Sequence, residues 1–339
     1  MSINVIKPGL LTTVQDLGRH GYQKYGVIVS GAMDSDSCRL ANLLVDNEKD
    51  AAVLEMTISG PTIEFQEDTL IAICGADMSA EIDGHPFQMN KAVWVKKASV
   101  LQFKSVQSGC RTYMAVAGGV DVPRVMDSYS TYLRAGIGGF KGRALQKDDV
   151  LPVGSPSNYA GILMKQMHTE ADAGHFREMD WGVSMNSLPD YREGAIIRTI
   201  PGRQAEWFTE KSRELFLSEP FTVSTKSDRM GYRLNGPELS LQNQQDLLSE
   251  AVAFGTIQVP PDGNPIVLMA DRQTTGGYPK IGQVITADLP AMAQLKPGEK
   301  IYFKEIKHSE AQTLLVENEK QFEQLKISIN LKKEQEGNA

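Results

Sequence analysis

The chain has 339 residues, of which 41% are hydrophobic and 23% are charged, and its formal net charge is −7. A length in this range predicts roughly two domains with ordinary hydrophobic cores. The acidic balance argues against a nucleic-acid partner, because binding a phosphate backbone requires a concentrated basic face, and the sequence has none. No segment approaches the ~18 to 20 apolar residues that span a bilayer, so we expect no membrane partner either.

The cysteine content and the N-terminus predict a cytoplasmic location. The three cysteines, Cys38, Cys74 and Cys110, are odd in number and far apart, which does not fit a disulfide framework. The N-terminal stretch "MSINVIKPGLL" lacks the long apolar region of a secretory signal. A reducing compartment fits both observations.

The first part of the chain predicts short strands separated by Gly, Pro and Asp turns. The clearest early helix is "DSDSCRLANLLVDN", with Asp34 or Ser35 as its N-cap and Leu40, Leu43 and Leu44 on its apolar face. Strands are expected after it at residues 69–76, 91–97 and 99–106. We place the first domain at residues 1–155.

Residues 156–192 have no sustained helical or strand period, so they predict a connector between two β-rich domains. The second domain, residues 193–327, contains expected strands at 195–200, 255–259 and 300–306. It ends in a helix that starts at a Ser309 and Gln312 capping box and has one apolar stripe: Ala311, Leu314, Leu315, Phe322 and Leu325. We expect this helix to pack on the second domain and residues 328–339 to form a disordered tail.

Two short motifs of the first half have echoes in the second half. "QDLGRHGY" places Asp16 and Arg19 ahead of a Gly-Tyr pair, and "SDRMGYR" places Asp228 and Arg229 ahead of another. The offset between matching motifs is not constant along the chain. A diverged duplication of a barrel-like domain explains the echoes, and so does chance matching of short turn motifs.

The stretch "DRQTTGGYPKIG", residues 271–282, directly follows the apolar run "PIVLMA". The Gly276-Gly277 pair allows a backbone to approach a ligand closely, while Gln273, Thr274 and Thr275 supply neutral donors and acceptors. This composition is typical of a recognition loop. The alternative is a hairpin turn, since Gly-Gly between two strand-like runs is a common hairpin signal.

Several widespread catalytic motifs do not occur in the sequence. The Gly-rich segment 136–143 lacks the spacing of a dinucleotide fingerprint, and no Walker motif is present, so Lys141 and Arg143 there are at most anion contacts. There is no HExxH or CxxC motif, no GxSxG nucleophile elbow, and the pair His168 and His175 fits a solvated polar segment better than a metal site. We therefore expect no metal site, and any ATP chemistry needs another chain to supply most of the nucleotide site.

Several long segments together point to a family. "PGLLTTVQDLGRHGYQKYGVIVSGAMD", "LEMTISGPTIEF", "AVAGGVDVP", "SDRMGYRLNGP", "TIQVPPDGNPIVLMADRQTTGGYPKIGQV" and "AQLKPGEKIYF" resemble the biotin-dependent carboxyltransferase, or allophanate hydrolase subunit 2, family. The resemblance covers about residues 7–303. It implies a mainly β fold of two cyclophilin-like β-barrel domains with a few short helices and a C-terminal helix.

The resemblance also implies partners and a reaction. The expected partners are a B-type subunit of the KipI kind, related to allophanate hydrolase subunit 1, and a further A-type subunit. Together they form an ATP-dependent 5-oxoprolinase, which opens the small molecule 5-oxo-L-proline to L-glutamate. ATP is then used by the complex and bound mainly by another subunit. Biotin is not expected on this chain, which has no Met-Lys-Met attachment motif.

Two other functions stay open. One is a regulatory protein that sequesters its KipI-like partner, which in one pair of this family inhibits a sporulation sensor kinase. The other is the carboxyl transfer from carboxybiotin that related domains of urea carboxylase perform. Opening a stable lactam requires carbonyl activation and stabilisation of an oxyanion, for which the neutral groups of the 271–278 loop are suited.

The candidate site residues come from the motifs that carry the resemblance. The arginines suit a carboxylate or phosphate, and the aspartates suit proton transfer or holding those arginines, although a structural role in a turn is the alternative for each acid. The predicted catalytic residues are Asp16, Arg19, Asp228, Arg229, Asp271 and Gln273. The predicted substrate-binding residues are Gln15, Ser30, Asp34, Glu55, Glu250, Gln258, Thr274, Thr275, Gly276, Gly277 and Tyr278.

The chain departs from the family pattern at three positions. Tyr129 in "DSYST" stands where an arginine is usual, which removes one anion contact. Asp46 and Ala251 each stand where glycine is common. The missing arginine weakens the transfer of carboxybiotin chemistry to this chain.

Overall fold

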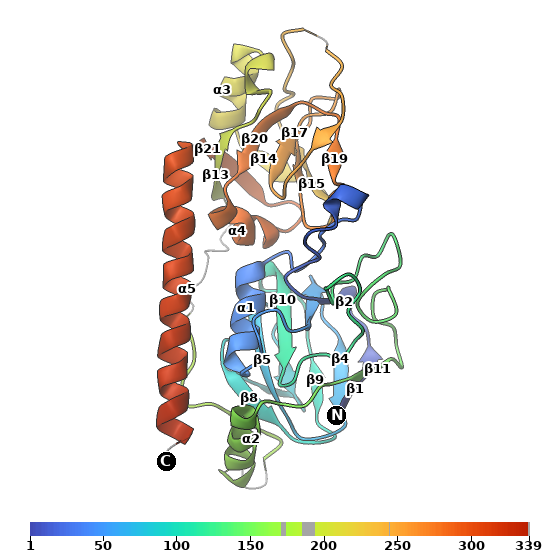
Figure 1. Ribbon diagram of the computed structural model, residues 1–339, viewed down its shortest axis with the longest axis vertical. Coiled ribbons are helices and arrows are strands. Elements are labelled where there is room, and N and C mark those ends of the chain that lie inside the picture. The colour runs from blue at the N-terminus through green and yellow to red at the C-terminus, as the bar shows by residue number, and fades with distance from the viewer. Residues whose placement is uncertain (171–173, 185–193, 244, 338–339) are drawn as a thin grey trace. The chain divides into compact units, whose positions relative to one another are not determined.

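The computed structural model describes residues 1–170, 174–184, 194–243 and 245–337, and the chain forms two compact units (Figure 1). The first unit comprises residues 1–20, 30–189 and 323–339, and the second unit comprises residues 21–29 and 190–322. The expected connector at 156–192 therefore belongs mostly to the first unit. Its residues 171–173 and 185–193 lie outside the described part of the chain.

The first unit contains two six-stranded sheets with antiparallel neighbours. One sheet has the order β11 (Val150–Pro152), β1 (Ser2–Lys7), β4 (Thr62–Phe65), β9 (Val100–Gln102), β6 (Glu81–Ile82), β7 (His85–Pro86). The other has the order β12 (Phe176–Glu178), β8 (Ala92–Val95), β5 (Thr69–Asp77), β10 (Ser108–Val116), β3 (Val53–Thr57), β2 (Leu11–Gln15).

The core of the first unit lies between these sheets. The side chains of β5 alternate between this core and a second hydrophobic cluster. Ile71 and Ile73 of β5 join a cluster that also takes in β1, β4 and β9, whereas Leu70 and Cys74 belong to a second cluster on the opposite face. Successive side chains of a strand point to opposite faces, so a strand buried on both faces is apolar at nearly every position. This explains the continuous apolar run "LIAICGA".

Helices cover the second face of that sheet. The helix α1 (Ser35–Leu44) has Asp34, one of the two predicted N-caps, as its N-cap, and the Asp34 carboxylate accepts the backbone N–H of Ser37 at 3.0 Å. Its residues Leu40 and Leu44 are buried in the second cluster. The carboxylate cap therefore fixes where the chain turns into the helix.

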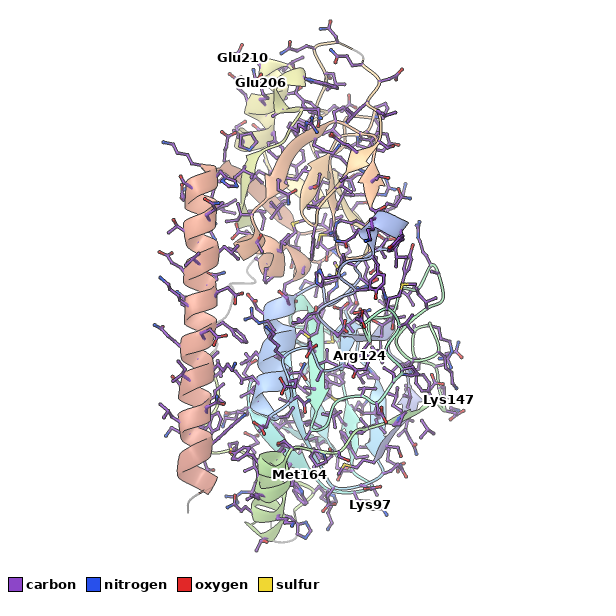
Figure 2. The ribbon with its side chains drawn as sticks, viewed as in Figure 1. Lys97, Arg124, Lys147, Met164, Glu206 and Glu210 are labelled. Atoms are coloured by element: carbon purple, nitrogen blue, oxygen red, sulfur yellow. The ribbon has the colours of Figure 1, made fainter. Side chains whose placement is uncertain are left out.

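A second helix, α2 (Asn158–Glu170), corrects the expectation of an irregular connector. Its residues Ala160, Leu163, Met164 and Met167 pack on the same cluster as α1 (Figure 2). Their spacing is helical, and the Ser157 hydroxyl accepts the backbone N–H of Ala160 at 3.0 Å. The glycines, prolines and polar residues around this short stripe hide its period in the sequence.

The second unit contains the closed β-barrel that the resemblance implies, and the mainly β fold with few helices is confirmed. Three phenylalanines meet inside the unit, with Phe216 stacked on Phe303 at 4.6 Å between ring centroids and Phe221 at 5.8 Å from Phe303. The barrel order is β13 (Ala195–Pro201), β20 (Lys280–Val284), β17 (Thr256–Gln258), β18 (Ile266–Leu268), β15 (Gly231–Asn235), β14 (Phe221–Val223), β21 (Lys300–Glu305).

Short helices complete the second unit. They are the α-helices α3 (Glu210–Ser218) and α4 (Leu289–Ala293), and the 3₁₀ turns η1 (Gln23–Tyr25), η3 (Ala205–Trp207) and η4 (Thr286–Asp288). Outside the barrel, β16 (Glu250–Ala251) and β19 (Thr275–Gly276) pair with each other as a two-stranded ribbon. This ribbon includes part of the 271–278 loop.

The last helix, α5 (His308–Gly337), differs from the expectation in three respects. It begins at His308, so Ser309 lies inside its first turn instead of capping it. It continues through residues 328–337, which the sequence predicts to be disordered. Its later part packs on the first unit, because Ile329 is buried in the α1 cluster and Lys333 donates to Asp46 at 2.8 Å.

Within the described ranges, no helix is both long enough and apolar enough to cross a membrane. The three cysteines are free and buried, as expected, and burial raises the pKa of the Cys38 and Cys74 thiols. A buried thiol with a raised pKa stays protonated and chemically inert.

Candidate functional site

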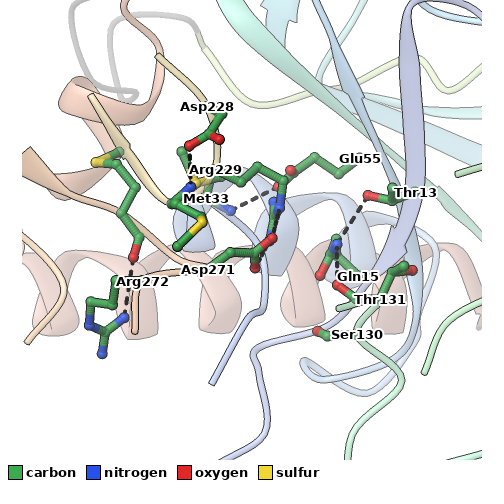
Figure 3. A network of polar contacts seen from close by, with 12 residues as sticks. Thr13, Gln15, Met33, Glu55, Ser130, Thr131, Asp228, Arg229, Asp271 and Arg272 are labelled. Atoms are coloured by element: carbon green, nitrogen blue, oxygen red, sulfur yellow. Dashed lines mark hydrogen bonds and ion pairs between the residues drawn. The ribbon is translucent and has the colours of Figure 1, made fainter. Parts of the chain in front are cut away.

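In the first unit, the segment 125–131 gathers three of the predicted site residues. The Arg19 guanidinium donates to the carbonyls of Val125 and Ser130 at 2.8 and 3.0 Å. The Gln15 amide donates to Thr131 O at 3.3 Å and to Thr13 Oγ1 at 3.0 Å (Figure 3). Tertiary contacts across more than 100 residues of sequence therefore bring these side chains together.

Asp16 is held by the same segment. Its carboxylate accepts the Ser128 hydroxyl at 2.8 Å, the Tyr129 N–H at 2.6 Å, the Gly18 N–H at 2.8 Å and a short hydrogen bond from the Ser130 hydroxyl. A carboxylate with four donors is held in place and fixes the local backbone. These contacts favour the structural alternative for Asp16, and its catalytic role stays a prediction.

Asp34 and Glu55 are linked through Tyr113. The Tyr113 hydroxyl donates to Glu55 Oε2 at 2.8 Å and accepts the Asp34 N–H at 2.8 Å, while Glu55 also accepts the Met33 N–H at 2.8 Å. Burial, followed by the Glu55 charge, raises the pKa of the Tyr113 phenol, which keeps its proton for this bond. The Asp34 carboxylate is engaged as the cap of α1.

Gln15 and Ser30 of the first unit each have a polar side-chain atom without a partner among the described residues. Gln15 is fully buried, and its Oε1 accepts no hydrogen bond. Ser30 is 5% exposed, its Oγ makes no hydrogen bond, and its backbone φ of 56° is unusual for a residue with a side chain. Buried polar groups are normally satisfied, so both atoms are candidates for contacts with a ligand.

In the second unit, Arg229 and Asp271 form a buried bidentate ion pair. Arg229 Nε and Nη2 each lie 3.0 Å from a different oxygen of Asp271, and the two side chains are 4% and 6% exposed (Figure 3). Nearby in sequence, Asp228 accepts the backbone N–H groups of Met230 and Gly231 and so holds a turn. Both aspartates thus have structural partners, and their predicted role in proton transfer remains untested.

The 271–278 loop is not the hairpin turn that the sequence left as an alternative. The strands on either side of it, β18 and β20, do not pair with each other, because both pair with β17. The loop instead forms the ribbon, with Glu250 opposite Gly276 and Ala251 opposite Thr275. Its remaining polar groups are accessible, since Gln273, Thr275 and Tyr278 are exposed or partly exposed and Thr274 is half-buried.

Glu250 is the centre of a polar cluster beneath the ribbon. Its carboxylate accepts Lys280 Nζ at 2.8 Å, Gln204 Nε2 at 2.9 Å and Arg203 Nη1 at 2.8 Å. The Lys280 ammonium, followed by the Gln204 amide, lowers the pKa of the Glu250 carboxyl. Glu250 is therefore a fixed anion over a wide pH range.

Gln258 lies next to this cluster, since it is the cross-strand partner of Lys280. It is 8% exposed, and its Oε1 has no hydrogen-bond partner in the described part of the chain. A Cβ atom added to Gly276 would lie 2.8 Å from this oxygen, and one added to Gly277 would lie 3.2 Å from Ser249 Oγ. The two glycines thus allow the ribbon to approach polar side chains closely.

Sequence reasoning missed several residues that build these sites. Lys280 and Gln204 are separated from Glu250 by 30 and 46 positions, and no motif connects them. Ser128 and Ser130 lie in the "DSYST" segment, where the family pattern draws attention only to Tyr129. The two serines, two positions apart, could have indicated a binding segment, because Ser hydroxyls often bind a nearby carboxylate or backbone group.

Two of the three departures from the family pattern have a structural counterpart. The Arg124 guanidinium lies 4.6 Å from the Tyr129 ring centroid, so a cation remains beside the position where an arginine is usual. Asp46 has a φ of 59°, a conformation that favours glycine. Its carboxylate instead binds Lys333 and Ser157.

The Gly-rich segment 136–143 forms tight turns, as expected. Its Arg143 holds Asp149 through two contacts of 2.6 and 2.7 Å, and Lys141 lies 3.8 Å from the same carboxylate. His168 and His175 lie beside separate carboxylates, Asp68 and Asp83. Within the described ranges, no group of three or more His, Cys, Asp or Glu residues is arranged to hold a metal ion.

Similarity to known proteins agrees with these findings. The chain matches the family model described as "Carboxyltransferase domain, subdomain A and B" over residues 25–305. It is 39% identical to the 5-oxoprolinase C subunit of Escherichia coli K12 over 323 residues, which are 95% of this chain and 97% of that protein.

Longer proteins contain a similar part. Urea amidolyase of Saccharomyces cerevisiae is 32% identical over 92% of this chain and 17% of its own length. The crystal structure of Kluyveromyces lactis urea carboxylase superposes with a TM-score of 0.84 and 30% identity, covering 95% of this chain and 29% of that one. The chain therefore belongs to the carboxyltransferase family of subdomains A and B, which confirms the family that its sequence motifs predict.

Proposed function

We propose that this chain is the C subunit of an ATP-dependent 5-oxoprolinase, which opens 5-oxo-L-proline to L-glutamate together with a KipI-like B-type partner and an A-type partner. The observation that carries this proposal is the 39% identity to a 5-oxoprolinase C subunit over nearly the full length of both chains. A second protein with that name, from Haemophilus influenzae, is 35% identical over 97% of this chain. ATP and both partner chains are part of the proposal.

The polar groups of the candidate site support the lactam as substrate. Gln258, which lies in the second unit with the 271–278 loop, is more than nine-tenths buried, and its Oε1 has no hydrogen-bond partner among the described residues. Leaving such an atom unpaired costs about 1–3 kcal/mol, which a ligand with complementary amide groups recovers. A lactam offers one N–H donor and one carbonyl acceptor, which match neutral amide and hydroxyl side chains.

The chemistry assigned to this chain is binding and orientation. Asp16, Asp34 and Asp271 already accept hydrogen bonds from backbone, hydroxyl or arginine donors at both carboxylate oxygens, so we assign none of them the role of general base. The exposed Gln273, with Thr274 and Thr275 beside it, supplies neutral donors for a developing oxyanion or for an activated carbonyl. Activation of the lactam by ATP is assigned to a partner chain.

The test is glutamate release by the three purified chains mixed with 5-oxoproline and ATP. We expect the activity to require this chain and to fall by about 10² or more when Gln273 is replaced by Ala, as for loss of one oxyanion donor. Gln312→Ala on the exposed side of α5 is the matched control and is expected to keep wild-type activity. Full activity in the absence of this chain rules the proposal out.

Carboxyl transfer from carboxybiotin is the second candidate function. It is favoured by the family model and by the TM-score of 0.84 with a urea carboxylase. In that case biotin arrives on another protein, and the assembled system loses its activity when avidin is added. Insensitivity to avidin, together with glutamate release, favours the 5-oxoprolinase.

A further inference from the structure

Three buried or half-buried arginines of this protein each hold a carboxylate through at least two hydrogen bonds. This geometry satisfies the guanidinium fork and offsets its loss of water. The pairs are Arg143 with Asp149, Arg198 with Asp288, and Arg229 with Asp271.

Arg272, in the 271–278 loop, does not follow this pattern. Its Nη1 donates to the Met269 carbonyl at a long 3.4 Å (Figure 3). Its guanidinium lies 5.7 Å from the Phe254 ring centroid. Its Nε is buried and has no hydrogen-bond partner among the described residues. No carboxylate pairs with Arg272 anywhere in the described ranges, although Asp271 is its neighbour in sequence.

The reason is that Asp271 is already occupied. Both of its oxygens accept from Arg229 at 3.0 Å, and Arg272 is directed away from it (Figure 3). Desolvation lowers the pKa of Arg272, and the Asp271 charge opposes this only in part. A partly desolvated cation without a counter-ion is unfavourable unless an anion binds to it.

We infer that Arg272 binds the carboxylate of the small-molecule substrate, and this inference rests on the proposed function. The 271–278 loop then matches its ligand in charge. It supplies one cation for one carboxylate, while Gln273, Thr274 and Thr275 supply neutral groups for the lactam. The planar guanidinium of arginine binds a carboxylate with two parallel N–H donors, whereas the ammonium group of lysine cannot form this bidentate pair. Arg272 is thus a specificity residue for lactams that carry an acid group.

The experiment compares two ligands in the reconstituted three-chain complex. The first is 5-oxoproline as substrate, and the second is 2-pyrrolidinone, the same lactam without the carboxylate, as competitive inhibitor. In Arg272→Met we expect the KM for 5-oxoproline to rise about 10- to 100-fold, as for loss of a charged hydrogen bond. The inhibition constant of 2-pyrrolidinone should stay within about twofold of the wild-type value, because no carboxylate is lost.

Two variants serve as controls. Arg272→Lys keeps the charge but not the fork, so we expect an intermediate KM. Arg233→Met removes an exposed arginine from β15 of the same barrel and should leave both constants unchanged. Thermal unfolding of each variant shows whether the fold is retained, and Arg272→Lys replaces Arg272→Met if the latter unfolds.

Each other outcome overturns the inference in a recognisable way. Equal weakening of 5-oxoproline and 2-pyrrolidinone makes Arg272 a structural residue of the loop. An unchanged KM in a complex that needs this chain refutes the role of Arg272 and leaves the proposed function intact. Failure of Arg272→Met to co-elute with the other chains places the carboxylate on a partner protein. Full activity without this chain refutes the proposed function and this inference together.

Discussion

The ammonium group of Lys280 lies 2.8 Å from the carboxylate of Glu250. This ion pair joins the barrel strand β20 to the ribbon strand β16, which belong to different sheets. Lys280 is 8% exposed and Glu250 is 23% exposed, so water screens the pair only in part. The position of the ribbon over Gln258 thus depends on a contact between residues 30 positions apart.

Replacing Lys280 by Met should destabilise the second unit and loosen the ribbon. The change leaves Glu250 with one fewer donor in a partly buried site, so we expect the free energy of unfolding to fall by about 1–3 kcal/mol. Urea denaturation measures this. Lys296→Met is the control, because Lys296 is 28% exposed and its pair with Glu299 is longer, 3.4 Å. Equal losses in the two variants contradict a special role for Lys280.

Gly276→Ala tests whether the close approach of the ribbon to Gln258 matters. The added Cβ meets Gln258 Oε1 at 2.8 Å, so either the ribbon or the amide has to shift. We expect the unfolding free energy to fall by about 1–3 kcal/mol, as in other overpacked sites. Glutamate release by the complex should fall as well, while co-elution with the partner chains persists.

Gly161→Ala is the matched control for that substitution. Gly161 lies in α2, has no neighbouring atom within 4 Å of an added Cβ, and does not have a positive φ. Alanine should therefore raise the unfolding free energy by about 0.5–1 kcal/mol, since it reduces the freedom of the unfolded chain. Destabilisation by both alanines would mean that the contact with Gln258 is not the cause.

Lys333 should anchor the end of α5 on the first unit. Its ammonium donates to Asp46 Oδ1 at 2.8 Å and to Leu43 O at 3.0 Å, and it is 6% exposed. Lys333→Met should lower the unfolding free energy by about 1–3 kcal/mol, because Asp46 loses a charged donor. Lys332→Met, on the exposed side of the helix, should be neutral. Hydrogen exchange of residues 323–337 provides a local measure of the same effect.

The ion pair of Arg143 with Asp149 should make stability depend on pH. The hydrogen bonds from Arg143 lower the pKa of Asp149 in the folded chain. Its contribution is therefore fully present above the unfolded pKa, near about 4, and is lost as the pH falls through the lower folded value. Arg143→Gln should cost more stability at about pH 7 than at about pH 3. An equal cost at both values would show that the contribution is not ionic.

The family, the mainly β fold and the start of α1 were all predictable from the sequence. Each depends on local or consecutive residues: long ordered motifs, continuous apolar runs such as "LIAICGA", and the cap at Asp34. The helical stripe of α2 was also present, but it is short and lies among turn-forming residues. The end of α5 was missed because its buried positions, Ile329 and Lys333, follow a long polar surface.

The composition of the 271–278 loop indicated recognition, but only the fold distinguished a loop from a hairpin. That distinction depends on β17 lying between β18 and β20 in the barrel. The order of strands in a sheet cannot be predicted from one short stretch of sequence. The same holds for the partners of the site residues. Tertiary contacts place Lys280 beside Glu250 and place Ser128 and Ser130 around Asp16. They also pair Asp271 with Arg229 and not with its sequence neighbour Arg272. The sequence by itself determines which residue types are present. The hydrogen-bond partner of each residue, its burial and its counter-ion depend on segments that come into contact only when the chain has folded.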